Sequence, residues 1–142
     1  MSSIDLLAPA AALGLAAIGS ALGTGVAGQA SIGAWKKCFA ANRPAPFMLT
    51  LFCGAPLTQT LYGFLLMLFI QRSQEEPLTL LSVGVFGGFA IGFSAMMQGR
   101  AGAGAADALA DTGKGVANYI TAIGIIESVA LFVMIFLFLL IF

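Results

Sequence analysis

The chain has 142 residues, of which 60% are hydrophobic and 8% are charged. Soluble domains carry about 25% charged residues, so this composition predicts a single membrane domain over residues 1–142. Six basic residues balance six acidic ones without forming a basic patch, so no nucleic acid is expected as a partner. The sequence has no histidine and two distant cysteines, and it therefore lacks the ligand spacing of a zinc site.

Four hydrophobic stretches follow one another along the chain, at about residues 4–35, 46–70, 78–109 and 115–142. Each is longer than the roughly 20 residues that cross the hydrocarbon core of a bilayer. The first stretch has Asp5 as its only early charge, whereas a signal peptide begins with basic residues. We therefore predict an all-α membrane protein with four transmembrane helices and both termini on one side.

The first and third stretches are rich in glycine, whereas the second and fourth are rich in bulky Phe, Leu and Met. The glycines concerned are Gly14, Gly19, Gly23, Gly25, Gly28 and Gly33, then Gly84, Gly87, Gly88, Gly92, Gly99, Gly102 and Gly104. Small residues let helix backbones approach closely. The pattern predicts an inner layer made by the first and third helices. It also favours a closed homo-oligomeric ring over a monomeric bundle.

Polar residues mark the second stretch. Ala55, Thr58, Gln59 and Tyr62 fall on one stripe of a helix through i, i+3 and i+4 spacing. Pro56 has no N–H and disturbs the hydrogen bonding one turn earlier. A main-chain carbonyl oxygen near Ala55 can then turn toward a ligand.

Glu127 is the only charged residue in the last 28 positions and lies near the middle of the fourth stretch. An ionised carboxylate at bilayer depth costs roughly 2.5–3.5 kcal/mol on insertion scales. Glu127 therefore predicts the handling of an ion or a proton. The alternative is a protonated glutamic acid that makes a hydrogen bond between helices.

Together with Gln98 of the third stretch, these residues offer two amide oxygens, a hydroxyl, a carboxylate and a carbonyl. Such a cage of hard oxygens with a single negative charge suits a monovalent cation. A proton site needs only the carboxyl group and one hydrogen-bond partner. The polar residues also have structural interpretations, because membrane Thr58 can bond to its own helix and the two glutamines can link helices.

Basic residues orient the predicted helices. Lys36, Lys37 and Arg43 follow the first stretch, whereas Arg100 and Lys114 lie near the end of the third, together with Asp107 and Asp111. The middle link has only Arg72, beside Glu75 and Glu76. The positive-inside rule then puts the links after helices 1 and 3 in the cytoplasm and both termini on the extracytoplasmic side of the cell membrane.

The alternation of helix types suggests an internal duplication. A shift of 74 residues pairs six identical small residues, with Ser20 opposite Ser94 and Gly28 opposite Gly102. A shift of 70 puts Leu57 opposite Glu127. We therefore predict two duplicated helical hairpins, 1–71 without a carboxylate and 77–142 with it.

Three segments together carry a resemblance to a known family. Residues 56–63 (Pro-Leu-Thr-Gln-Thr-Leu-Tyr-Gly), 97–100 (Met-Gln-Gly-Arg) and 126–128 (Ile-Glu-Ser) resemble the rotor-ring proteolipid of V-type (vacuolar/archaeal-type) ATPases. Members of this family are called the K-subunit in bacteria and the c-subunit in eukaryotes. The likeness covers all four helices. In the two-helix F-type proteolipids a similar motif carries the carboxylate, where this chain has Leu57.

The resemblance to sodium-translocating members implies a ligand set. In this chain it consists of Glu127, Thr58, Gln59, Gln98 and the backbone oxygen of Ala55, with Tyr62 donating its hydroxyl to Glu127. Sodium-type relatives tend to have small glycines where this chain has Leu57-Thr58 and Thr60, so the pocket is expected to be tighter here. A proton is therefore the alternative cargo, and no cofactor is expected.

The resemblance also implies the surrounding machine: a homo-oligomeric ring in the bilayer, a stator membrane subunit that supplies an arginine, and a central-stalk subunit. The sequence contains no G-x-x-x-x-G-K-[ST] loop, so ATP would be hydrolysed or synthesised elsewhere in that complex. A small four-helix proton-coupled multidrug exporter is the alternative from another class. Its glutamate would be expected in the first helix, near aromatic residues.

Overall fold

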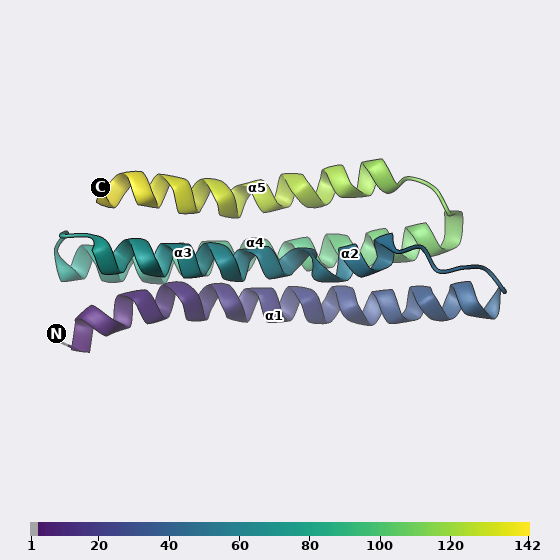
Figure 1. The fold of residues 1–142 in the computed structure, drawn as a ribbon, viewed down its shortest axis with the longest axis horizontal. Coiled ribbons are helices and arrows are strands. Elements are labelled where there is room, and N and C mark those ends of the chain that lie inside the picture. The colour runs from purple at the N-terminus through teal and green to yellow at the C-terminus, as the bar shows by residue number, and fades with distance from the viewer. Residues whose placement is uncertain (1–2) are drawn as a thin grey trace.

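The computed structural model describes residues 3–142, which form a bundle of long helices (Figure 1). The elements are α1 (Ser3–Ala40), α2 (Met48–Gly54), the 3-10 turn η1 (Ala55–Leu57), α3 (Thr58–Arg72), α4 (Pro77–Thr112) and α5 (Val116–Ile141). Within these described residues, four segments are long and apolar enough to cross a membrane: α1 from Asp5, α2 to α3, α4 and α5. The predicted all-α class with four membrane-spanning segments is confirmed.

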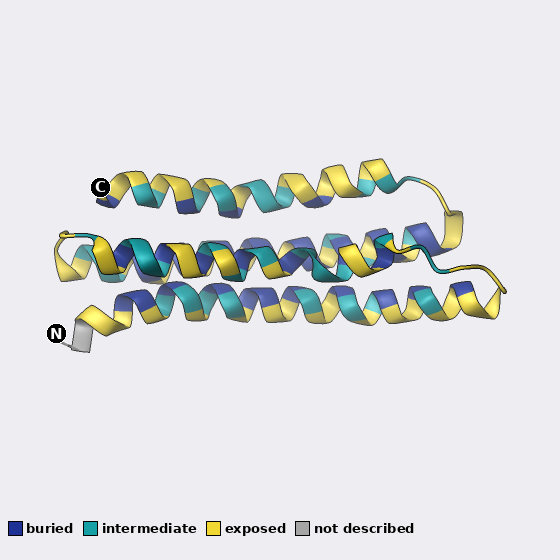
Figure 2. Cartoon of the chain, in the orientation of Figure 1, coloured by how far each residue is buried: buried dark blue, intermediate teal, exposed yellow. Residues whose placement is uncertain are grey.

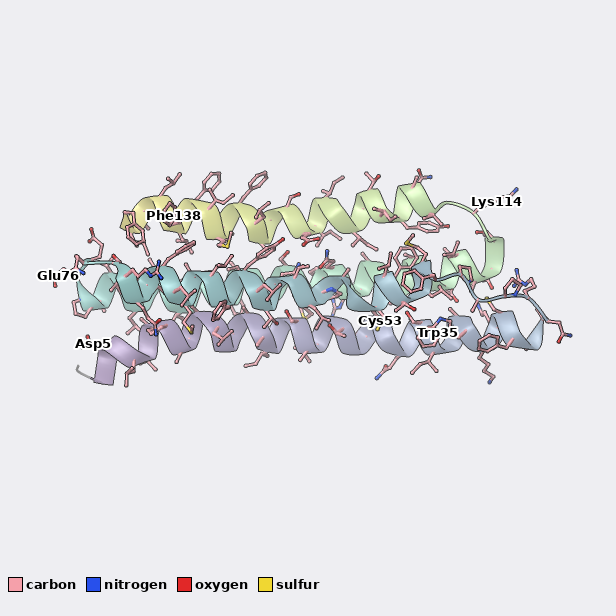
Figure 3. The ribbon with its side chains drawn as sticks, in the orientation of Figure 1. Asp5, Trp35, Cys53, Glu76, Lys114 and Phe138 are labelled. Atoms are coloured by element: carbon pink, nitrogen blue, oxygen red, sulfur yellow. The ribbon has the colours of Figure 1, made fainter. Side chains whose placement is uncertain are left out.

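The helices are arranged so that α1 and α4 run in one direction, while α2–α3 and α5 return in the other (Figure 1). The start of α1, the α3–α4 connection and the end of α5 lie at one end of the bundle. The two connections predicted to be cytoplasmic lie together at the opposite end, which carries Lys114, whereas Glu76 marks the first end (Figure 3). The N-terminus itself, residues 1–2, lies outside the described residues.

The second stretch is not the single helix expected over 46–70. It is divided at Pro56, where one turn of 3-10 helix connects α2 to α3. Because Pro56 has no N–H, the carbonyl of Phe52 loses its usual helical partner. The backbone tightens here, and the N–H of Thr58 bonds to the oxygen of Ala55 three residues earlier. Pro56 thus separates the segment that carries the polar stripe from α2.

Glycine explains why α1 and α4 share the most extensive contact in the bundle. A Cβ atom on Gly19 would collide with the backbone of Gly92, and one on Gly99 with the backbone of Gly23. The two helices therefore touch through their main chains, as small residues allow. By contrast, a Cβ on Gly104 would meet no atom of the described residues within 4 Å.

The four spans differ in how far they are buried, and exposed and half-buried residues cover most of α5 (Figure 2). In the apolar windows of the four spans, 39% of α1 and 44% of α4 is buried, against 28% of α2–α3 and 17% of α5. This distribution agrees with the predicted inner layer of glycine-rich helices. Bulky side chains such as Phe132 and Phe136 of α5 remain exposed on the bundle surface.

Polar contacts close the end of the bundle that holds the α1–α2 and α4–α5 connections. Lys37 of α1 pairs with Asp107 at 2.7 Å and with Asp111 at 2.9 Å, both on α4. Arg43 donates to the backbone oxygen of Ala110 at 2.8 Å, near the end of α4. Gly113 then turns the chain with a φ of 66°, a conformation that favours glycine.

Candidate ion-binding site

Glu127 lies half-buried near the middle of α5, between that helix and the polar stripe of α3. The hydroxyl of Tyr62 donates to its Oε1 at 2.9 Å. The amide Nε2 of Gln98 on α4 donates to its Oε2 at 3.2 Å. Three helices thus meet at one carboxylate, and each carboxylate oxygen accepts a hydrogen bond. The hydrogen bond from Tyr62 that the family resemblance implies is present.

Two fully buried glutamines connect α3 to α4 behind this carboxylate. Gln59 and Gln98 are both 0% exposed, and Nε2 of Gln59 donates to Oε1 of Gln98 at 2.8 Å. Gln98 also donates to the backbone oxygen of Ile123 at 3.2 Å. Buried amides without partners would cost free energy, so these bonds explain how the apolar bundle accommodates both side chains.

Thr58 and the backbone of Ala55 complete the network at its α3 end. The hydroxyl of Thr58 lies 3.0 Å from the oxygen of Ala55 and 3.1 Å from Oε1 of Gln59. The 3-10 turn at Pro56 brings the Ala55 oxygen to this hydroxyl. The structure therefore brings all six residues of the predicted set into one connected network.

One orientation differs from the sequence-based expectation. The sequence suggested that Gln98 offers an amide oxygen, but in the structure its nitrogen faces Glu127 and its oxygen accepts from Gln59. Donors therefore run from Thr58 through both glutamines to the carboxylate. For Gln98 to present its oxygen to a cation beside Glu127, its amide group must rotate by about 180°, which exchanges donor and acceptor.

Sequence analysis missed Ser94. Its hydroxyl donates to the backbone oxygen of Ile126 at 2.8 Å, and the side chain is only 5% exposed. Ser94 precedes Gln98 by one helical turn on the same face of α4. That spacing of two polar residues on an otherwise apolar face is the signal that could have identified it.

Other charged and reactive residues lie outside the network. Arg100 is exposed, and its Nη1 lies 4.0 Å from Sδ of Met97. Leu57, which the 70-residue shift pairs with Glu127, is 55% exposed. Among the described residues, no group of three His, Cys, Asp or Glu side chains could hold a metal ion. Glu127 is the carboxylate of the network, and its hydrogen-bond partners are a tyrosine hydroxyl and a glutamine amide.

A comparison with protein families finds a match to the model of the ATP synthase C-subunit over residues 81–140. The matched segment includes most of α4 and α5, and with them Ser94, Gln98 and Glu127. No curated protein matches the chain significantly. Proteins of the matched family form homo-oligomeric rings that translocate ions. The match shows that the part of the chain over residues 81–140 is similar to the ATP synthase C-subunit.

Proposed function

We propose that the chain is the rotor-ring subunit of a V-type rotary ATPase and that Na⁺ is the cargo carried at Glu127. The observation that carries this proposal is the convergence of Tyr62 and Gln98 on one half-buried carboxylate in an apolar helix. The match of α4 and α5 to the ATP synthase C-subunit supports the rotor role. The pairing of two hairpins with a single membrane carboxylate supports the V-type assignment.

Charge balance explains how such a site would move. An ionised Glu127 facing lipid is unfavourable, whereas a carboxylate with one bound Na⁺ or H⁺ is neutral and can turn through the bilayer. At the stator, an arginine of another subunit would displace the ion into a water-accessible path. A central stalk would link this rotation to ATP hydrolysis or synthesis elsewhere in the complex.

The proposed ligands of Na⁺ are Glu127, Thr58, Gln59, Gln98 and the backbone oxygen of Ala55. Tyr62 holds Oε1 of Glu127, which leaves Oε2 for the cation once the Gln98 amide rotates. Amide, hydroxyl, carbonyl and carboxylate oxygens are the hard ligands that such cations prefer. The cage has a single negative charge, so a dipositive ion would leave one positive charge uncompensated.

The positions of the basic residues support one orientation of the chain in the membrane. Lys36 and Lys37 lie in the last turns of α1, Arg43 in the α1–α2 connection and Lys114 in the α4–α5 connection, and these segments lie at the same end of the bundle. We propose that this end faces the cytoplasm. The start of α1 and the end of α5 would then be extracytoplasmic, and the central stalk would approach the connections rather than the termini.

Labelling with a hydrophobic carbodiimide, which attacks protonated carboxyl groups, tests the cargo. The detergent-solubilised protein is labelled with and without Na⁺, and the modified residue is identified by mass spectrometry. We expect Glu127 to react and Na⁺ to slow the reaction, while Glu76 in the exposed loop serves as the internal reference. Labelling that follows pH alone would make H⁺ the cargo, and a Glu127 that never reacts would contradict the rotor proposal.

The oligomeric state tests the role independently of the cargo. A rotor-ring subunit forms a detergent-stable oligomer many times larger than the 14.5 kDa chain. A small exporter would instead be recovered as a dimer. Native mass spectrometry of the purified protein distinguishes the two, and a dimer would overturn the rotor proposal whatever ion protects Glu127.

A further inference from the structure

We infer that Ser94 is a positioning residue for Glu127, and this inference rests on the proposed ion site. Its hydroxyl bonds to the oxygen of Ile126, the residue immediately before Glu127. Gln98, one turn further along α4, bonds to the oxygen of Ile123. Two side chains of α4 therefore hold the backbone of α5 within the turn that ends in the carboxylate.

The surrounding packing shows why these bonds matter. A groove of about 450 Å³ separates α4 from α5 beside Ser94 and is lined by Phe89, Phe93 and Met97 of α4 and by Ile125 and Val129 of α5. The groove is an open edge of an otherwise packed contact, since Ile123, Ala130 and Met134 of α5 are buried in the bundle. α5 is also the least buried of the spans. The Ser94 bond therefore adds a restraint on α5 along this open edge of the contact.

The hydrogen bond from Ser94 opposes a rotation of α5 that would affect the position of Glu127. Rotation of α5 about its axis would carry Glu127 away from Tyr62 and Gln98, since both bonds reach it from the α3 and α4 side. A hydrogen bond to the adjacent carbonyl opposes that rotation at short range. Ser94 does not contact the carboxylate itself, so its effect passes through the backbone of Ile126.

The first hairpin offers an internal contrast. The 74-residue shift pairs Ser94 with Ser20, which is also buried at 2% exposure. Yet Oγ of Ser20 has no hydrogen-bond partner among the described residues. The equivalent serine thus lacks the bond in the half of the chain where Leu57 takes the place of the carboxylate. The first hairpin does have an interhelical serine bond, from Ser31 to the oxygen of Leu49 at 3.0 Å, but at the position equivalent to Ser94 the bond occurs only in the hairpin that carries the acid.

The test compares Ser94→Ala with Ser94→Thr in the detergent-solubilised protein, using the Na⁺ concentration that halves carbodiimide labelling of Glu127. We expect Ser94→Ala to require about 3- to 10-fold more Na⁺, the factor that one net hydrogen bond supplies. Ser94→Thr keeps the hydroxyl, and its methyl group has room in the groove, so it should restore protection. Ser128→Ala is the matched control, because that hydroxyl bonds within α5 to Gly124.

The outcomes separate this inference from the proposed function. Normal Na⁺ protection in Ser94→Ala would overturn the positioning role and leave the sodium site intact. If Na⁺ fails to protect even the unsubstituted protein, the sodium proposal fails, and Ser94 is then judged by the labelling rate without Na⁺. A rate changed by Ala but restored by Thr supports positioning, and an unchanged rate overturns it. Should Ser94→Ala not assemble, Ser94→Cys replaces it, since the thiol is a weaker donor of similar size.

Discussion

The two hairpins of this chain share a close contact between their first helices but differ in their second helices. α1 and α4 run in parallel and meet through Gly19, Gly23, Gly92 and Gly99. Their partners differ, because α5 is one continuous helix whereas the first hairpin is broken at Pro56 into α2, η1 and α3. The continuous helix carries the acid. The broken one carries Thr58, Gln59 and Tyr62, whose side chains complete the network.

This difference teaches that the hydrogen-bond network around Glu127 does not belong to either hairpin alone. The second hairpin supplies Glu127 and Gln98, and the first supplies the residues that bond to them. Because the first hairpin has Leu57 where the second has its acid, it contributes neutral hydrogen-bond partners to the network. The predicted duplication would thus have produced two halves with complementary roles.

The largest effect should come from removing the acid. Glu127→Gln keeps the shape but eliminates the charge that balances a bound cation, and an unpaired buried charge costs about 3–5 kcal/mol. We expect Na⁺ binding to weaken by more than about 100-fold, measured with radioactive Na⁺ on the purified protein. Glu76→Gln, in the exposed α3–α4 connection, is the control and should bind normally. Equal binding by both variants would place the cation elsewhere.

A methyl group at Gly99 should break the contact that the two hairpins share. The Cβ of Gly99→Ala would overlap the backbone of Gly23, and such overpacking costs about 1–3 kcal/mol. Thermal unfolding in detergent measures the loss. Gly104→Ala is the matched control on the same helix, because its Cβ meets no atom of the described residues and alanine favours helix. Equal destabilisation by both substitutions would contradict the role given to the α1–α4 contact.

Removing the hydroxyl of Tyr62 should weaken Na⁺ binding at Glu127 without abolishing it, because the first hairpin then loses one of its hydrogen bonds to the site. Hydrogen bonds to charged groups contribute about 1.5–3 kcal/mol, so Tyr62→Phe should raise the Na⁺ concentration that protects Glu127 by at least about tenfold. Carbodiimide labelling over a Na⁺ series checks this. Tyr119→Phe is the control, since Tyr119 contacts Phe52 at the other end of the bundle through its ring edge. Unchanged protection in Tyr62→Phe would limit the site to the second hairpin.

The smallest effect is expected at the ion pairs between the hairpins. Lys37 and Asp111 are equivalent under the 74-residue shift and pair with each other, but both side chains are about half exposed. Exposed pairs often contribute nothing measurable. Lys37→Gln should therefore leave the thermal midpoint within experimental error, with Lys36→Gln as the control. A clear loss specific to Lys37 would show that polar contacts, and not only glycine, align the hairpins.

Much of the fold could be predicted because its causes are local. Length and hydropathy determine the four spans, and the glycine content of residues 4–35 and 78–109 predicts that these helices pack closely. The break at Pro56 was only partly foreseen: proline removes a donor in any helix, but the 3-10 turn depends on how α2 packs against its neighbours. The pairing of Gly19 with Gly92 likewise depends on the axial offset of two helices, which no local pattern specifies.

The sequence predicts which residues form the candidate site, but not which of them donate and which accept hydrogen bonds. Helical spacing puts Ala55, Thr58, Gln59 and Tyr62 on one face, and the family resemblance connects them to Glu127. An amide can donate or accept, however, so the sequence alone cannot orient Gln98. Ser94 was missed because its partner is the backbone oxygen of Ile126, and every residue of α5 offers the same kind of acceptor.

The glycine contact between α1 and α4 also has an entropic consequence. Glycine and alanine have no side-chain rotamers to lose when they become buried, whereas each leucine or isoleucine loses about 0.5–1 kcal/mol on ordering. The two hairpins thus join through a surface that forms without that loss. Its geometry is defined by the main chain alone, so no repacking of side chains can change the distance between the helices. Any backbone movement at Glu127 is accordingly expected from α5 and α3, whereas α4 contributes through side chains such as Gln98 while its backbone stays fixed against α1.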